Sequence, residues 1–295
     1  MLTFPAAAAL PPDQAACLPT EADCAAYAQR GWHVSDAIVP ARLLDAAAED
    51  IARYRRGERD ASIPAQATQR DWVEGAAQVI RINGYLSLQM RAVRDLVAYP
   101  AIAAIAGRLA RTREIRLFHD RLIVKPGGLP AASTETGWHT DVAYWGNSSS
   151  TELLTAWIPL ADCSVNDGTL AVVEGSHRWP TISLERRFLT PDFDGQVPRT
   201  MVPDAVEPVV RVLPVTRGQV VFHHSRVLHR SVPNLGTAPR IALAVHLQDE
   251  ANRHQPWIQP NGRRAMHSNE LLCRPTPGGA PDFADPRVFP VLWRE

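Results

Sequence analysis

A histidine and an aspartate stand two residues apart in the segment TGWHTDVAYW, at His139 and Asp141. In a β-strand, residues i and i+2 point to the same face, so an imidazole nitrogen and a carboxylate oxygen could bind one metal ion. The spacing alone also fits a surface strand with a local hydrogen bond, because a chain with 10 histidines produces such pairs by chance. The pair therefore predicts a metal site only if a third ligand accompanies it.

Candidates for the third ligand lie in the segment GQVVFHHSRVLHRSVPNLGTAPRIALAVHL, which contains His223, His224, His229 and His246. His229 is the preferred ligand because of its surroundings. Ser231 follows on the same strand face, and the next strand begins at Arg240 after the turn PNLGTAP. Antiparallel pairing of these strands would place the Arg240 guanidinium beside His229.

Two histidines and one carboxylate on one side of a metal form the facial triad of non-haem Fe(II) oxygenases, which leaves three coordination positions open. An adjacent arginine can hold a dicarboxylate through a bidentate contact. The same ligands also serve zinc enzymes. A jelly-roll binding protein could likewise retain such a site without catalysis. The predicted anion site at Arg240 and Ser231 favours the oxygenase over both alternatives.

The segments that carry these residues resemble the phytanoyl-CoA dioxygenase family of Fe(II)/2-oxoglutarate oxygenases. The resemblance runs from about Ala22 to Gln248 and is concentrated in WHTD, TAWIPLADCSVNDGTLAVVEGSHR, GQVVFHHSRVLHRSVPN and PRIAL. It implies that iron is bound by His139, Asp141 and His229.

The resemblance also assigns residues to the cosubstrate. It implies that Arg240, assisted by Ser231, holds the distal carboxylate of 2-oxoglutarate. Trp157 and Thr155 are expected to lie near the same molecule. Family members often carry Gln where this chain has Thr140, a departure that concerns only a contact behind the ligands.

The activity that the resemblance implies is a dioxygenase reaction with Fe(II), 2-oxoglutarate and O2. It would hydroxylate, or otherwise oxidise, an unactivated C–H bond of a small molecule, and the segments HTDVAYW and EGSHRW favour a secondary-metabolite intermediate. Desaturation, epimerisation, cyclisation and acyl-CoA oxidation are the alternatives. Scarce lysine argues against coenzyme A, whereas Arg186, Arg187 and Arg199 could bind a carboxylate or phosphate.

Four residues are candidates for contacting the substrate. Tyr144 and Trp145 follow the His-x-Asp pair and could line the pocket or pack in the core. Successive side chains of a strand point to opposite faces, so one of His223 and His224 is expected to face the pocket, and His223 is the candidate. Asn83 lies in VIRINGYL, which could border the pocket mouth or face solvent. Ordinary hydrogen-bonding roles are expected for His119, His177, His246, His254 and His267.

The elements that must position these residues fall into two groups. Helices are expected at residues 20–30, 41–56 and 88–109, from helical spacing of apolar residues or an N-terminal capping pattern. Strands are expected at GWHVSDAIV and QVIRINGYL, and after Arg116 at IRLFHDRLIVK, TGWHTDVAYW, ELLTAWIPL, GTLAVVEGS, RVLPV, QVVFHHS, VLHRSV and RIALAVHLQ. We therefore predict a mainly β (α+β) fold, a cupin-like double-stranded β-helix jelly roll flanked by N-terminal helices.

A single domain is expected over residues 20–295, after a loose Ala/Pro-rich leader at residues 1–19 that lacks the positive region of a secretory signal. Two long polar segments interrupt the pattern. Residues 57–75 read as a loop, and residues 183–208 as an insertion between strands that could act as a lid.

Composition limits the remaining classes of function. The 295 residues are 45% hydrophobic, enough for a packed core, and 31 basic residues balance 31 acidic ones. Without a basic excess or stripe, a nucleic-acid partner is not expected. Lys125 is the only lysine. The expected partner is a small-molecule substrate, and nothing in the composition points to an oligomeric state.

Other absent patterns narrow the class further. No run of 18 apolar residues is present, so no membrane span is expected. The 4 cysteines form no CxxC pair, which predicts reduced thiols and a cytoplasmic location. The chain also lacks GxSxG, P-loop and GxGxxG motifs, which argues against serine hydrolases, kinases and dinucleotide-binding enzymes.

Overall fold

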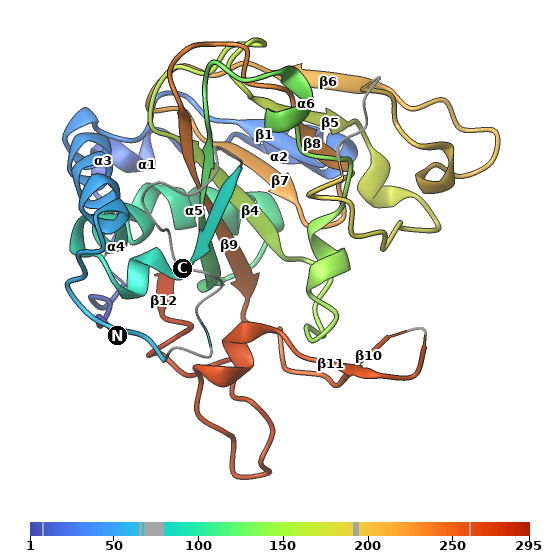
Figure 1. Cartoon of the computed structure of the whole chain (residues 1–295). Coiled ribbons are helices and arrows are strands. Elements are labelled where there is room, and N and C mark those ends of the chain that lie inside the picture. The colour runs from blue at the N-terminus through green and yellow to red at the C-terminus, as the bar shows by residue number, and fades with distance from the viewer. Residues whose placement is uncertain (8, 65–66, 68–79, 191–194, 260) are drawn as a thin grey trace.

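Two antiparallel sheets pack against each other at the centre of the molecule (Figure 1). The computed structural model describes the chain except residues 8, 65–66, 68–79, 191–194 and 260. The large sheet has the order β1 (Trp32–Val34), β7 (Val221–His224), β4 (Leu154–Pro159), β9 (Arg240–Asp249), β3 (Glu114–Lys125) and β12 (Val291–Arg294), with β2 (Arg81–Gly84) paired to β3. The small sheet has the order β6 (Val210–Leu213), β5 (Leu170–Val173), β8 (His229–Ser231). The predicted jelly roll is confirmed.

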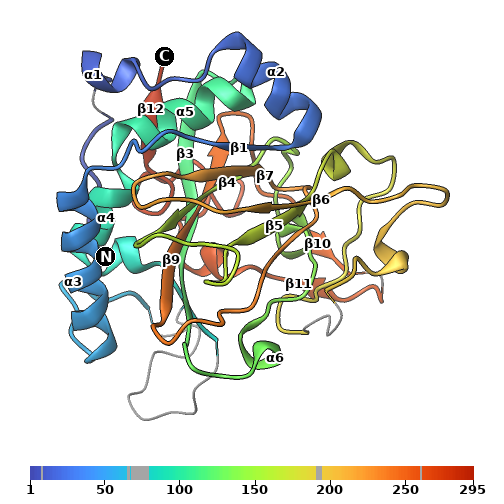
Figure 2. The same cartoon turned by 90° about the horizontal axis from the view of Figure 1, so that it is seen from above.

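The N-terminal helices cover the outer face of the large sheet. In both views α3 and α4 lie on one side of the molecule, and the small sheet lies on the other (Figures 1 and 2). The helices are α1 (Pro12–Ala15), α2 (Glu21–Arg30), α3 (Ala41–Arg55), α4 (Arg91–Val97) and α5 (Pro100–Ala110). A short helix α6 (Ala131–Thr134) and the hairpin of β10 (Trp257–Ile258) and β11 (Arg264–Ala265) lie elsewhere.

The helix predicted over residues 88–109 is wrong as one element, since α4 and α5 are separate. Pro100 occupies the first turn of α5, where its missing N–H costs nothing. The residue before a proline is disfavoured in the helical conformation, so α4 has to end earlier. The helix predicted to begin at Thr20 is present as α2, and its capping box joins Thr20 and Asp23.

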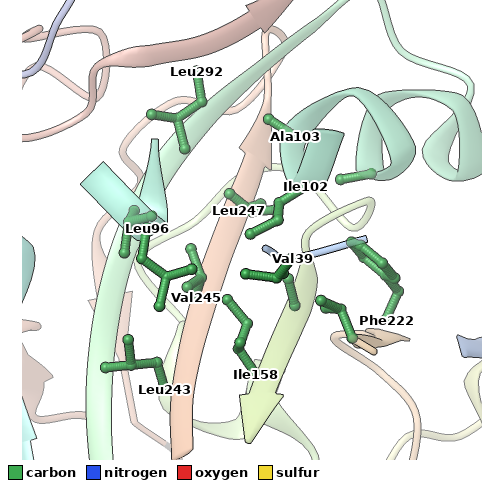
Figure 3. Packing of buried hydrophobic residues seen from close by; sticks show 14 of the residues in the cluster. Val39, Leu96, Ile102, Ala103, Ile158, Phe222, Leu243, Val245, Leu247 and Leu292 are labelled. Carbon is green, nitrogen blue, oxygen red and sulfur yellow. The ribbon is translucent and has the colours of Figure 1, made fainter. Parts of the chain in front are cut away.

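Both faces of the large sheet are buried, which explains the nearly continuous apolar run of β9. Leu243, Val245 and Leu247 pack on the helix side against residues such as Leu96 and Ile102 (Figure 3). The alternate residues of β9 face the small sheet, where Ala242 and Ala244 pack with Trp157, Leu170 and Val172. This inner space between the two sheets contains the candidate site.

A β-bulge in β3 decides which of its residues face that inner space. Leu117 pairs with Leu247 and His119 with His246, so Phe118 is an extra residue on β3. Before the bulge, Leu117 packs on the helix side. After it, Ile123 packs on the inner side, in step with Arg121 and Lys125, so the bulge reverses the alternation of this strand.

The segments outside the sheets differ in their structure. In the leader, Leu2 is buried and its N–H donates to Leu88 O at 2.8 Å, so its start contacts the domain. The segment 183–208 connects the two neighbouring strands β5 and β6, and residues 65–66 and 68–75 of the 57–75 loop lie outside the described residues. Across the described residues, no helix has the length and apolarity needed to cross a membrane.

Gly31 provides a test of the packing between α2 and the small-sheet side. It ends α2 at φ +81°, and a Cβ there would overlap Val227 and His177. We expect Gly31→Ala to lower the free energy of unfolding by about 2–4 kcal/mol, the sum of left-handed strain and overpacking. Chemical denaturation measures this loss. The control Gly57→Ala has φ +89° with no atom within 4 Å, so it should cost only about 1 kcal/mol. Equal losses in both variants would contradict the packing argument.

Candidate metal centre and its cavity

His139 and His229 are joined through their backbones. Each N–H donates to the carbonyl oxygen of the other residue at 2.9 Å, which forms an isolated antiparallel bridge. The strand predicted over TGWHTDVAYW is therefore wrong. His139 forms an isolated bridge rather than part of a longer strand pairing, and a 3-10 turn begins at Asp141 (Asp141–Tyr144). The turn, rather than strand alternation, directs Asp141 toward the two imidazoles.

The same local hydrogen bond orients both imidazole rings. His139 Nδ1 donates to Gly137 O and His229 Nδ1 donates to Val227 O, each at 2.9 Å. A carbonyl oxygen only accepts, so both protons are on Nδ1 and both Nε2 lone pairs remain available. A metal-binding histidine is usually fixed in this way by a partner on its other nitrogen.

The two carboxylate oxygens of Asp141 have different contacts. Oδ2 accepts from Thr155 Oγ1 at 2.6 Å and from His223 Nε2 at 3.2 Å. Oδ1 lies 3.8 Å from His229 Nε2. Ligand atoms of His139, Asp141 and His229 all lie within 4.8 Å of one another, and all three residues are buried. The geometry therefore brings together the predicted triad and leaves Oδ1 for a metal ion.

The protonation states suit metal binding. Burial lowers the pKa of His139, and burial together with His139 and His223 lowers the pKa of His229 well below its ordinary value. Burial opposes ionisation of Asp141, but the surrounding histidines, His229 foremost, hold its pKa well below the usual range. Neutral imidazoles and an ionised carboxylate are the forms that bind a metal.

Behind Asp141, a buried polar row crosses four strands of the large sheet. His119 pairs with His246, His246 with Thr155, and Thr155 with His223. Since the Thr155 hydroxyl donates to Asp141, it accepts from His246 Nδ1 at 2.8 Å. Burial lowers the pKa of His246 to about 3, so this residue is neutral. Sequence analysis gave His246 no role at the site, although its even spacing from Arg240 places both on one face of β9.

Arg240 and Ser231 lie on the wall of the same cavity as the triad, which has a volume of about 310 Å³. The Arg240 guanidinium carbon is 5.4 Å from the centre of the Trp157 ring, and Nη1 donates to Ile123 O at 3.4 Å. Its buried Nε has no hydrogen-bond partner among the described residues. Burial lowers the pKa of Arg240 to about 10, so it stays charged at neutral pH. The side chain is therefore a buried cation with a free donor.

Ser231 is held from both sides. Its hydroxyl lies 2.9 Å from Thr136 Oγ1, and its carbonyl accepts from Lys125 Nζ at 3.0 Å. Lys125 also donates to Val232 O at 2.7 Å and is completely buried. Sequence analysis noted Lys125 as the only lysine but assigned it no role. In the structure it fixes the strand end that carries Ser231.

The predicted substrate residues are only partly brought together. Tyr144, Trp145 and His223 line the cavity, whereas His224 points away and lies 3.7 Å from Glu152. Asn83 does not line the cavity, which corrects the prediction. It pairs with Leu122, whose side chain packs on the helix side, while the preceding residue, Ile82, lines the cavity. One step along a strand moves a side chain to the other face.

Several lining residues were not among the four predicted substrate residues. The 183–208 segment contributes Arg186, Phe188 and Leu189 to the wall, and β3 contributes Arg121. Phe188 contacts the His139 ring, with the ring centres 4.9 Å apart. The length of the segment indicated a lid, and Arg186 was a candidate for binding an anion. No pattern indicated that Phe188 and Leu189 line the cavity.

Comparison with known proteins identifies similar chains. A family model described as phytanoyl-CoA dioxygenase (PhyH) matches residues 27–242. The chain is 31% identical over 133 residues to a probable alpha-ketoglutarate-dependent hypophosphite dioxygenase of Stutzerimonas stutzeri, and the match covers 44% of each chain. It therefore spans less than half of that relative's length.

Two solved structures share the fold. The non-heme alpha ketoglutarate dependent epimerase SnoN from nogalamycin biosynthesis superposes with a TM-score of 0.69 at 24% identity, covering 93% of this chain and 96% of SnoN. The carbocyclase SnoK from the same biosynthesis superposes with a TM-score of 0.67 at 21% identity, covering 92% and 96%. These likenesses establish the architecture of the two sheets and their helices.

Thr155 offers a test of the hydrogen bonds behind the metal centre. Thr155→Val removes the donor to Asp141 Oδ2, so we expect roughly 10- to 100-fold weaker binding of Mn(II), typical for loss of a partner behind a metal ligand. Calorimetric titration of the metal-free protein measures this. Thr169→Val, which removes a buried hydroxyl bonded to Leu213 O, is the control and should bind Mn(II) normally. Unchanged affinity in Thr155→Val would show that Asp141 is oriented without it.

Proposed function

The chain belongs to the phytanoyl-CoA dioxygenase family, and from this we propose that it is an Fe(II)- and 2-oxoglutarate-dependent dioxygenase that oxidises a small organic substrate. The observation that carries the proposal is that the triad of His139, Asp141 and His229 shares one cavity with the buried cation of Arg240. A cosubstrate that chelates a metal and ends in a second carboxylate needs both. A hydrolytic zinc site binds no such cosubstrate and therefore does not need the Arg240 guanidinium.

The residues fit both Fe(II) and 2-oxoglutarate. Two imidazole nitrogens and one carboxylate oxygen would hold Fe(II) and leave three positions open. The partnerless Nε of Arg240 and the Ser231 hydroxyl would hold the distal carboxylate of 2-oxoglutarate. When bound, iron and 2-oxoglutarate would activate O2 for removal of hydrogen from an unactivated C–H bond, and 2-oxoglutarate would be converted to succinate and CO2.

The protein's own contribution is orientation and exclusion of water. Thr155 and His223 hold Asp141 so that one oxygen faces the metal position. Apolar side chains of Ile123, Leu170 and Phe188 line the cavity around it. These apolar side chains keep water away from the reacting centre, which strengthens the electrostatic contacts inside.

A secondary-metabolite intermediate is the substrate class we propose, with hydroxylation as the outcome. A cavity of about 310 Å³ suits a small molecule. Desaturation, epimerisation and cyclisation start from the same removal of hydrogen and are alternative outcomes, as is oxidation of an acyl-CoA. We also propose a cytoplasmic location, which the free thiols of all 4 cysteines support.

Replacing each metal ligand tests the triad. We expect His139→Ala, Asp141→Ala and His229→Ala to abolish succinate formation from 2-oxoglutarate and Fe(II) binding, while circular dichroism shows an intact fold. His33→Ala, on β1 and outside the cavity, is the control and should keep both. Near-normal activity of His229→Ala would move the third ligand to His223, which also lines the cavity.

Arg240 is tested by its effect on the cosubstrate. Loss of a buried charge-assisted contact costs roughly 2–5 kcal/mol, so Arg240→Ala should raise the KM for 2-oxoglutarate about 30-fold or more. Binding of Fe(II) alone should not change, because Arg240 is not a ligand. Arg211→Ala, on the exposed strand β6, is the matched control. An unchanged KM would exclude Arg240 as the cosubstrate anchor.

A further inference from the structure

The cavity contains more positive charge than the proposed metal and cosubstrate require. Among the described residues, its wall includes four arginines and one acidic residue, Asp141. The arginines are Arg121, Arg186, Arg230 and Arg240. Two have partners, since Arg230 pairs with Glu135 and Arg240 would pair with the cosubstrate. Arg121 and Arg186 are left over.

The charges at the metal centre cancel without Arg121. A divalent metal ion with Asp141, the doubly charged cosubstrate and Arg240 form a neutral group. The negative charge of Asp141 raises the pKa of Arg121, but a bound metal ion would neutralise that charge. No carboxylate of the described residues forms an ion pair with Arg121, and burial lowers its pKa. Arg121 is half-buried at the cavity wall, and a cation partly removed from water without a counterion is costly, so a ligand that brings an anion would bind favourably here.

Arg121 and Arg240 act on different parts of the cavity. Arg121 lies on β3 opposite Ala244, four residues along β9 from Arg240, a distance of about 13 Å along the strand. Burial is the main cause of the low pKa of His119, His246 and His267, and the positive charge of Arg121 lowers each of them further. Arg240 instead contributes to the lowered pKa of Lys125. The two guanidinium groups therefore serve opposite ends of the cavity.

The surroundings of Arg121 describe the rest of the ligand. Ile82, Trp145, Phe188 and Leu189 are apolar and aromatic residues that line the same cavity as Arg121. Arg186 lies at the same wall, with its guanidinium carbon 4.3 Å from the Trp257 ring centre and its Nε donating to Ala143 O at 3.0 Å. A molecule with an apolar body and one acidic group matches this combination.

We propose that Arg121 binds a carboxylate of the organic substrate, so that the enzyme acts on a small apolar or aromatic carboxylic acid. The proposal rests on the proposed function, because it assumes that metal and 2-oxoglutarate occupy their own positions. A guanidinium fork binds a carboxylate through two parallel hydrogen bonds. Held there, the acid would place its apolar body toward the triad, and Arg121 would determine specificity without touching the metal.

Binding of matched acids and amides tests this. The protein is loaded with Mn(II) and saturating 2-oxoglutarate, and calorimetry measures the Kd of 4-phenylbutyrate, octanoate and their carboxamides. For the unmodified protein we expect at least one acid to bind about 10-fold or more tightly than its amide. Arg121→Gln should remove this preference and leave the Kd of 2-oxoglutarate within twofold. Arg116→Gln, on the same strand but paired with Glu114 outside the cavity, should keep the preference.

Three outcomes would overturn the proposal. The first is that no acid of the series binds more tightly than its amide. The second is that the preference survives in Arg121→Gln. The third is that Arg121→Gln weakens 2-oxoglutarate instead, which would make Arg121 part of the cosubstrate site. Failure of the proposed function would be distinct, since 2-oxoglutarate would then show no Mn(II)-dependent binding to the unmodified protein. Repeating the acid titration at twice the 2-oxoglutarate concentration excludes competition at Arg240.

Discussion

Two backbone hydrogen bonds between His139 and His229 hold the candidate site together. They attach an otherwise irregular segment to the edge of the small sheet at the two residues whose side chains must converge. Each imidazole is then fixed by the carbonyl two residues before it, at Gly137 and Val227. One backbone contact and one repeated local hydrogen bond therefore set the positions of two of the three ligands before any metal is bound.

The third ligand depends on the large sheet. A row of polar side chains, from His119 through His246 and Thr155 to His223, crosses an interior that is otherwise apolar. Burying polar groups is costly unless they are hydrogen-bonded, and in this row His246, Thr155 and His223 form hydrogen bonds. Here they end on Asp141, where two donors occupy one oxygen and leave the other free. The sheet that forms the core thus also orders the carboxylate.

Sequence reasoning predicted what depends on local pattern. Residue types and spacing, with the family resemblance, predicted the triad and Arg240, although a 3-10 turn rather than strand alternation directs Asp141. Turn residues predicted where the strands are separated. It failed where strand pairing determines which side chains face the cavity, because a periodic pattern does not reveal the register of a strand or its bulges. The bulge at Phe118 turns Arg121 inward, and pairing with Leu122 turns Asn83 away from the cavity. The inward residues of the 183–208 segment depend on its long-range contacts, which leave no periodic signal.

Burial of Lys125 has a practical consequence. It is the only lysine in the chain, and its amine is enclosed and bonded to two carbonyls. The folded protein therefore presents no lysine to acylating reagents, bifunctional amine crosslinkers or amine-coupled sensor surfaces. All other basic side chains apart from histidine are guanidinium groups, which such reagents leave unmodified. Site-directed coupling can instead use thiol chemistry, for which the partly exposed Cys17 and Cys273 are available handles.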